Sequence, residues 1–166
     1  MAVAVELAGA FPEAAELLDA LRVAGLTVAV AESCTGGLLG AALTAFAGAS
    51  DVVVGGVISY ADSVKTELLD VPDELLRTYG AVSGEVAAAM AAGVRGRCGA
   101  GVGIGITGVA GPGAEGSAKP TGLIYVAVDS AAGTEVVRLE GDSGREGNRT
   151  GAVHAAIALA LHDLAR

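Results

Sequence analysis

The 166-residue chain has few aromatic residues, cysteines and prolines: no tryptophan, three tyrosines, two phenylalanines, two cysteines and four prolines. Two cysteines in a chain of this length do not make the disulfide framework of a small secreted protein. With so few aromatic rings, the core must consist mainly of closely packed Ala, Val, Leu and Ile. The chain is 52% hydrophobic and long enough for such a core, so we predict a single domain over residues 1–166.

Positive charge is also scarce, with 10 Lys and Arg against 19 Asp and Glu and a formal net charge of −9. Without a basic cluster we expect no nucleic-acid partner, although one local pocket could still bind a small anion. No apolar run is long enough to span a membrane, and residues 1–5 lack the basic start of a signal peptide. We therefore expect a cytoplasmic protein without a membrane partner.

Metal-ligating residues are few as well. His154 and His162 are eight residues apart in one predicted helix, and no cysteine or paired carboxylate stands at ligand spacing from them. Structural and catalytic zinc sites need three or four such ligands. We predict no metal site.

The most reactive stretch is residues 28–37, VAVAESCTGG. Its apolar start predicts a buried strand, and its glycines lead into a predicted helix over residues 38–43. Amide groups left unpaired at such a helix start can bind an anion or an oxyanion. Ser33 and Cys34 are then two candidate nucleophiles beside an oxyanion pocket. The alternative is that Ser33 or Thr35 only caps the helix, which is the commoner role for Ser and Thr there.

A second candidate pair follows the next strand, predicted over residues 52–60 and interrupted by Gly55 and Gly56. Tyr60 ends this strand, and Lys65 lies in the first turn of a predicted helix over residues 63–69. Both side chains can project toward one point. The alternative is a surface lysine beside an aromatic residue at the sheet edge.

The complete pattern predicts an α/β fold: a three-layer α/β/α sandwich with a mixed, mostly parallel sheet of about five strands and one antiparallel hairpin. Helices covering a sheet on both faces account for the alternation along the chain. Helices are predicted over residues 12–24, 38–43, 63–69, 72–79, 83–97 and 145–164, and strands over 27–31, 52–60, 100–107, 121–129 and 134–140.

Residues 103–108, GIGITG, match the dinucleotide-binding fingerprint, and Asp129 lies about where an acidic ribose ligand would. We reject this motif because its glycines lie within the predicted strand. Pro112, Pro120 and further glycines also forbid the helix that must follow. A long glycine-rich loop over residues 108–120 is instead typical of a segment that wraps around a ligand.

Five motifs follow one another in the order ESCTGG (32–37), GGVISY (55–60) with Lys65, GAVS (80–83), TGVAGPG (107–113) and KPTG (119–122). Together they resemble the C-terminal domain of the CinA (competence/damage-inducible) proteins in its stand-alone form. The resemblance covers the chain from about Leu17 to its end. It implies a nicotinamide-nucleotide amidase of pyridine nucleotide salvage, which hydrolyses nicotinamide mononucleotide to nicotinate mononucleotide and ammonia without a cofactor. The metal-dependent pyrophosphatase domain of the larger CinA proteins is not expected here.

The resemblance also implies roles for individual residues. Ser33 matches the family's nucleophile, Lys65 its base, and Tyr60 lies beside them. The family pattern Gly-Asp-Arg-x-x-x-Arg appears as Ser143-Gly144-Arg145 followed by Arg149, with Gly-Asp shifted to 141–142. The predicted catalytic residues are thus Ser33, Lys65 and Tyr60, and the predicted substrate-binding residues are Thr35, Gly36, Gly37, Thr107, Gly108, Gly111, Arg145 and Arg149.

Lysine as the base agrees with the residues available, since neither histidine lies near the reactive stretch. A free lysine titrates near about 10.4, so Lys65 needs a much lower pKa, which burial would supply. One alternative keeps the enzyme but makes Cys34 the nucleophile, because thiols at helix starts are activated. The other is a non-catalytic module that senses a nucleotide or binds a partner in the competence and DNA-damage response. The glycine-rich apolar surface is compatible with a homo-oligomer.

Overall fold

A computed structural model of the chain describes residues 6–113 and 118–166. Two features of the sequence analysis lie partly or wholly outside the described residues. They are the first five residues, over which no signal peptide was predicted, and residues 114–117 of the predicted ligand-wrapping loop.

The described residues form the predicted elements, with boundaries shifted by at most about three residues, and two short additional helical turns, α1 and η1. The helices are α1 (Leu7–Ala10), α2 (Glu13–Ala24), α3 (Leu38–Thr44), the 3₁₀ helix η1 (Ala49–Asp51), α4 (Asp62–Leu69), α5 (Asp73–Tyr79), α6 (Gly84–Cys98) and α7 (Gly144–Leu164). The strands are β1 (Val28–Glu32), β2 (Val53–Ile58), β3 (Val102–Gly108), β4 (Ile124–Ser130) and β5 (Gly133–Leu139).

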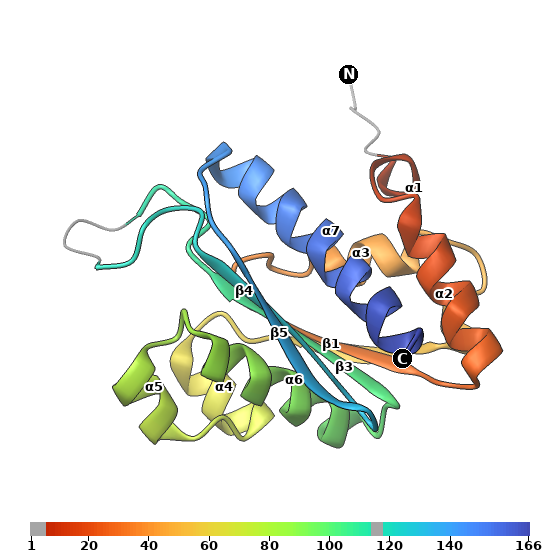
Figure 1. Ribbon diagram of the computed structural model, residues 1–166, viewed down its shortest axis with the longest axis horizontal. Coiled ribbons are helices and arrows are strands. Elements are labelled where there is room, and N and C mark those ends of the chain that lie inside the picture. The colour runs from red at the N-terminus through yellow and green to blue at the C-terminus, as the bar shows by residue number, and fades with distance from the viewer. Residues whose placement is uncertain (1–5, 114–117) are drawn as a thin grey trace.

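The five strands form one sheet in the order β2-β1-β3-β4-β5. Strand β1 pairs in parallel with both β2 and β3, and β4 pairs antiparallel with β3 and β5. Figure 1 shows α2, α3 and α7 on one face of this sheet and α4, α5 and α6 on the other. The predicted α/β/α sandwich with a mixed sheet is therefore confirmed. None of the helices in the described part of the chain could span a membrane.

The two faces of the sheet carry side chains of different size. Toward α7, the central strands present Val and Ile side chains that are fully buried in the main core. Toward α6 most of their positions are small residues, with Tyr125 and Asp129 of β4 as the larger exceptions. The small residues are Ala29, Ala31, Gly103, Gly105 and Ala127.

This asymmetry explains the glycine pattern that resembles a dinucleotide fingerprint. A Cβ atom on Gly103 would lie 2.1 Å from the Ala91 carbonyl oxygen, and one on Gly105 would lie 2.4 Å from that of Ala87. The glycines therefore let the backbone of α6 rest directly on β3. All three glycines of the motif lie within β3, and β4 rather than a helix follows, so the rejection of the fingerprint is confirmed.

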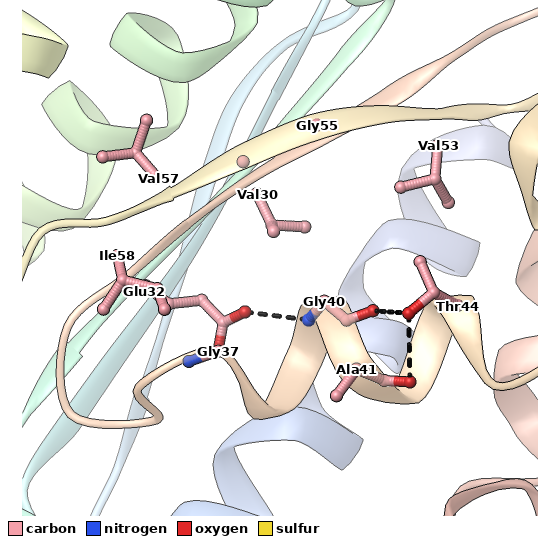
Figure 2. Close-up of a pocket in the computed structure, with 11 residues that line it drawn as sticks. Val30, Glu32, Gly37, Gly40, Ala41, Thr44, Val53, Gly55, Val57 and Ile58 are labelled. Carbon is pink, nitrogen blue, oxygen red and sulfur yellow. Dashed lines mark hydrogen bonds between the residues drawn. The ribbon is translucent and has the colours of Figure 1, made fainter.

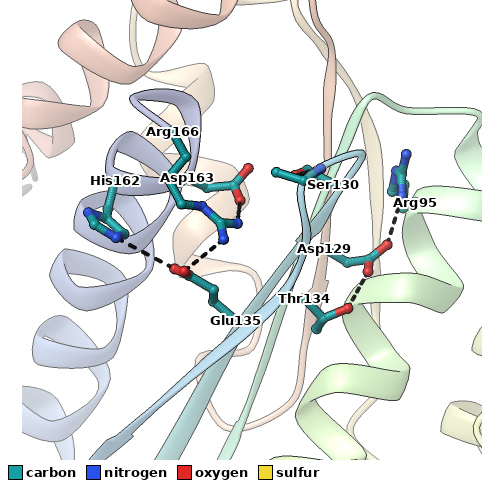
Figure 3. Close-up of polar contacts among 9 residues, drawn as sticks. Arg95, Asp129, Ser130, Thr134, Glu135, His162, Asp163 and Arg166 are labelled. Carbon is teal, nitrogen blue, oxygen red and sulfur yellow. Dashed lines mark hydrogen bonds and ion pairs between the residues drawn. The ribbon is translucent and has the colours of Figure 1, made fainter.

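Asp129, at the position of a ribose ligand in that rejected motif, has a structural role instead. Its carboxylate accepts hydrogen bonds from Arg95, at 3.0 Å, and from Thr134 (Figure 3). It joins α6 to the β4–β5 hairpin. Asp129 pairs with Gly103 near the start of β3, so this cluster lies at the opposite end of β3 from Thr107 and Gly108.

The chain order places a crevice between β1 and β3. After β1 the chain moves outward through α3 to β2, and it then returns across the other face through α4, α5 and α6 to β3. The direction of the crossovers thus reverses between β1 and β3. In open α/β sheets, ligands bind outside the carboxyl ends of the strands at such a reversal. The segments that follow Glu32, Ile58 and Gly108 meet there.

Candidate active site

Ser33 is the first residue after β1, and its amide donates to the Ile106 carbonyl oxygen at 2.9 Å, which continues the pairing with β3. The chain then turns sharply into α3 through Gly36 and Gly37, whose φ angles are +59° and +100°. These angles favour glycine. A Cβ atom on Gly37 would also lie 3.1 Å from the Ile58 side chain. The glycines of the sequence motif therefore permit the turn that presents Ser33.

The buried carboxylate of Glu32 caps the start of α3. It accepts hydrogen bonds from the amides of Gly37 (3.1 Å), Leu39 (3.0 Å) and Gly40 (2.8 Å), as Figure 2 shows in part. The helix start was predicted to form an oxyanion pocket, and this prediction is wrong, because Glu32 occupies those donors. The amides of Cys34 and Thr35 remain, and no other residue in the described ranges accepts a hydrogen bond from them.

Replacement of Glu32 by alanine is expected to destabilise the protein by about 3 kcal/mol or more, since three backbone donors lose their acceptor and each unsatisfied buried donor costs about 1–3 kcal/mol. Urea unfolding followed by circular dichroism measures this. Glu67→Ala on the exposed side of α4 is the matched control. Equal stabilities for the two variants would show that the turn does not depend on the Glu32 carboxylate.

Lys65 comes from the middle of α4 and is 1% exposed. Its Nζ lies 3.0 Å from Ser33 Oγ and donates to the carbonyl oxygens of Ser59 (2.7 Å) and Tyr60 (3.2 Å). A carbonyl oxygen only accepts hydrogen bonds, so a neutral Lys65 directs its two N–H groups to these carbonyls. Its lone pair then faces the Ser33 hydroxyl, which is the arrangement a general base needs.

Burial lowers the pKa of Lys65, and the nearby carboxylate of Asp62, 3.9 Å away, opposes this shift only in part. Because the Asp62 side chain is 63% exposed, water screens its charge. Burial acts in the opposite sense on the other candidate nucleophile and raises the pKa of the Cys34 thiol to about 11. At neutral pH this thiol is protonated, which disfavours Cys34 as a nucleophile.

Ser33 and Lys65 open into a cleft of about 320 Å³. Seven of the predicted site residues line it, and four, namely Thr35, Gly36, Gly37 and Arg149, do not. The residues that line the cleft are Ser33, Cys34, Tyr60, Lys65, Ala81, Val82, Thr107, Gly108, Val109, Ala110, Gly111, Pro112, Gly113 and Arg145.

Arg145, from the start of α7, spans the mouth of this cleft. It donates to the Gly111 carbonyl oxygen at 2.8 Å and to the Tyr60 hydroxyl at 3.4 Å. Tyr60 is 60% exposed, so its ring lies at the rim, while its backbone carbonyl faces Lys65. The hydrogen bonds of Tyr60 therefore join Lys65 and Arg145 through two different atoms, its carbonyl oxygen and its hydroxyl.

Arg149, one turn further along α7, supports the turn after Ser33 from outside the cleft. Its guanidinium donates to the Thr35 carbonyl oxygen at 2.8 Å, and Thr35 itself is fully buried. Gly37 lines a second hollow, between α3 and β2, which also has a volume of about 320 Å³ (Figure 2). The one titratable side chain on that hollow is Glu32, whose carboxylate is already bonded to α3. Of these two hollows, the first cleft therefore contains the reactive Ser33 and Lys65 side chains.

Two residues that shape the cleft were missed by the sequence analysis. Asn148 is buried in α7 and donates to the Ala110 carbonyl oxygen at 2.9 Å, which anchors the loop after β3. Lys119 donates to the carbonyls of Tyr79 and Val82 and so anchors the other wall. The KPTG motif contains Lys119 and could have indicated it. No sequence signal distinguishes Asn148 from a surface asparagine.

Among the described residues, no three His, Cys, Asp or Glu side chains lie close enough together to hold a metal ion. His154 contacts Glu13, and His162 lies 3.8 Å from Glu135 (Figure 3). Both histidines of α7 are thus paired with acidic residues of neighbouring elements, Glu13 of α2 and Glu135 of β5. Neither lines the cleft.

The fold and the cleft define an α/β/α sandwich with a buried Ser–Lys pair at the carboxyl ends of its parallel strands. The chain belongs to the CinA C-terminal domain family, whose model matches residues 11–164. A "CinA-like protein" from Gemmatimonas aurantiaca is 50% identical over 153 residues, which cover 92% of this chain and 35% of that protein. A "putative competence-damage inducible protein" from Desulforamulus reducens is 47% identical over 85% of this chain and 34% of its own length.

Solved structures agree with the family assignment. The competence/damage inducible protein of Agrobacterium tumefaciens matches with a TM-score of 0.89 and 37% identity over the full length of both chains. The competence damage-inducible protein A of Klebsiella pneumoniae matches with a TM-score of 0.90 and 32% identity over 95% of this chain and 98% of that chain. By contrast, the present chain spans about a third of the length of the curated relatives it matches.

Proposed function

We propose that the protein is an amidase that hydrolyses the carboxamide of nicotinamide mononucleotide through an acyl-enzyme on Ser33. The observation that carries this proposal is the buried Lys65 Nζ, 3.0 Å from Ser33 Oγ and bonded on its other sides to carbonyl oxygens. Such a lysine is held ready to accept the hydroxyl proton. The family resemblance supplies the substrate.

In the proposed reaction, Ser33 Oγ attacks the amide carbon while Lys65 takes its proton. The oxyanion that forms is bound by the amide of Cys34, which lines the cleft and which the cap on α3 leaves available. Lys65 then returns the proton to the leaving nitrogen, the C–N bond breaks, and ammonia departs. Water, deprotonated by Lys65, hydrolyses the ester and restores Ser33.

Arg145 is the best placed residue to bind the phosphate of the nucleotide. Its guanidinium lies at the mouth of the cleft beside the loop over residues 108–113, whose glycine-rich backbone suits an anion. Arg149 is already bonded to the Thr35 carbonyl outside the cleft. We therefore assign the phosphate to Arg145 and the loop.

Arg145→Gln is expected to raise the KM for nicotinamide mononucleotide about 10–100-fold, as the loss of a charged hydrogen bond of about 1.5–3 kcal/mol implies. Activity on free nicotinamide, which has no phosphate, should be low in the wild type and change little in the variant. Steady-state kinetics on both substrates measure the difference. If the KM for both substrates rose equally, Arg145 would act on the fold of the cleft and not on the phosphate.

The direct test of the proposed function is the release of ammonia from nicotinamide mononucleotide by the purified protein. Formation of equimolar ammonia and nicotinate mononucleotide supports the amidase. Tight nucleotide binding without ammonia release would favour the non-catalytic sensing module instead.

A further inference from the structure

One hydroxyl group near Lys65 has no role in the reaction described so far. Ser59 is fully buried, and its Oγ has no hydrogen-bond partner among the residues that the structure describes. Its backbone is fully bonded: the amide donates to the Glu32 carbonyl at 2.7 Å, and the carbonyl accepts from Lys65 Nζ at 2.7 Å. A buried hydroxyl without a partner destabilises a fold, so its presence beside a reactive lysine needs an explanation.

The sheet register places this hydroxyl beside the Ser–Lys pair. Glu32 pairs with Ile58 on β2 and with Ile106 on β3, so Ser33 is next to Ser59 on one side and Thr107 on the other. Side chains alternate along a strand, and neighbouring residues in register share a face. Ser59, Ser33 and Thr107 therefore form a row on the face covered by α4, from which Lys65 reaches Ser33. Thr107 has its own partner, the Ala81 carbonyl at 2.8 Å.

We propose that the Ser59 hydroxyl is a positioning group that accepts a hydrogen bond from Lys65 while Lys65 carries the proton of Ser33. This inference rests on the proposed function. The neutral amine has two N–H groups, and the carbonyls of Ser59 and Tyr60 accept both. The ammonium has a third N–H, and once Ser33 Oγ is bonded to the substrate carbon it is a poor acceptor. After a rotation about χ1, the Ser59 hydroxyl replaces Ser33 Oγ as the acceptor of this third N–H.

The proton balance is unchanged by this role. Lys65 gains the proton that Ser33 loses as the O–C bond forms, and it gives that proton to the nitrogen as the C–N bond breaks. Ser59 neither gains nor loses a proton; it stabilises the ammonium between the two events. Its effect is therefore on the protonated form of Lys65 alone.

Other charged and titratable groups around Lys65 are known and can be held constant. Asp62 lies on the same helix at 3.9 Å, and Cys34 lies on the turn of Ser33. Tyr60 lies two residues after the end of β2, and Arg145 of α7 reaches its hydroxyl. Lys119 donates to the carbonyl oxygen of Val82 in the wall of the cleft. A Ser59→Ala change alters none of them, so a change in the pKa of Lys65 reports the hydroxyl.

The test is a double-mutant cycle in which the pKa of Lys65 is measured in each variant. NMR titration of the Lys65 Cε signal gives this pKa and needs no turnover. In a Ser33→Ala background Lys65 has lost the Ser33 acceptor, as it has in the acyl-enzyme. In this Ser33→Ala background, Ser59→Ala should lower the proton affinity of Lys65 about tenfold or more. When Ser33 is intact, the same change should lower it by less. Ser59→Thr, which keeps a hydroxyl, should leave the proton affinity of Lys65 unchanged. An equal pKa with and without the Ser59 hydroxyl in the Ser33→Ala background would overturn the proposal.

Kinetics and stability give a second, independent readout. Ser59→Ala should lower kcat for nicotinamide mononucleotide about 10–100-fold with little change in KM, and it should leave the melting temperature unchanged or raised. The matched control is Ser130→Ala at the far end of β4, because Ser130 Oγ accepts a bond from the Ala132 amide at 3.0 Å. That variant should lose stability and keep its kcat.

The two proposals fail separately. A wild-type protein that releases no ammonia refutes the amidase but leaves the NMR cycle to decide on Ser59. An active wild type whose Ser59→Ala variant keeps full kcat refutes the role of Ser59 alone. If the alanine variant does not fold, Ser59→Thr with full activity and Ser59→Gly with reduced kcat support the hydroxyl, and equal kcat values for the two refute it.

Discussion

Ser33→Ala is expected to reduce the release of ammonia from nicotinamide mononucleotide at least about 10³-fold, because the removal of a nucleophile eliminates the covalent route. The Ser33 hydroxyl is the one that Lys65 Nζ approaches, at 3.0 Å. Since the Ser33 side chain lines the cleft, removal of its hydroxyl leaves no gap in the apolar core, and the variant should keep the wild-type melting temperature. The measurement is a coupled ammonia assay at saturating substrate.

Cys34→Ala is the matched control for the neighbouring candidate nucleophile. Burial raises the pKa of its thiol to about 11, so the thiolate is scarce at neutral pH and activity should remain within a few fold of the wild type. Iodoacetamide should likewise inactivate slowly, and EDTA should have no effect. Inactivation of the enzyme by a chelator with recovery on zinc addition would contradict the serine mechanism, as would loss of activity in Cys34→Ala with Ser33→Ala still active.

Lys65→Arg is expected to be nearly as damaging as Lys65→Met, with losses of about 10²–10⁴-fold, because arginine keeps the charge but does not deprotonate in a protein. In the wild type, the logarithm of kcat/KM should rise with unit slope as pH increases toward the pKa of Lys65. Burial lowers that pKa, so the rise should end at a lower pH than the ordinary lysine pKa of about 10.4. Activity retained in Lys65→Arg, with an unchanged ascending limb, would make Lys65 a fixed positive charge and not the base.

The same pKa shift has a consequence for stability. Between the lowered pKa of folded Lys65 and its ordinary value, the unfolded chain binds more protons than the folded one. The free energy of unfolding therefore increases as pH rises through that window. Below the folded-state pKa of Lys65, the full destabilisation from burying its charged form is present. Lys65→Met removes this titration, so its stability should change less with pH across that window than the stability of the wild type. Chemical unfolding at two pH values measures the difference.

The order and type of the long elements were predictable from the sequence because apolar periodicity and glycine punctuation are local signals. The runs VAVA of β1 and VGIGI of β3 are apolar without interruption, and they become strands buried on both faces. The rejected dinucleotide motif was also decidable from the sequence, since its glycines lie in the strand and no helix can follow Pro112. The pairing of β1 between β2 and β3 has no such local signal.

The roles of polar residues near Ser33 depended on contacts between distant segments. The sequence placed unpaired amides at the start of α3, but only the structure shows that the Glu32 carboxylate occupies them. Arg145 and Arg149 look alike in sequence, four residues apart in one helix. Arg145, at the start of α7, reaches the mouth of the cleft, whereas Arg149, one turn later, reaches the Thr35 carbonyl outside the cleft.

The sequence by itself determined the α/β sandwich, the family and the residues Ser33 and Lys65, since these follow from local periodicity and from motifs that keep their spacing. Only the tertiary structure decided the chemistry available to those residues. A lysine is a base or a solvated charge according to its burial and its neighbours, and the neighbours of Lys65 come from two strands and a helix that meet only in the folded sheet. Desolvation and hydrogen-bond geometry arise from that meeting, so no local pattern encodes them.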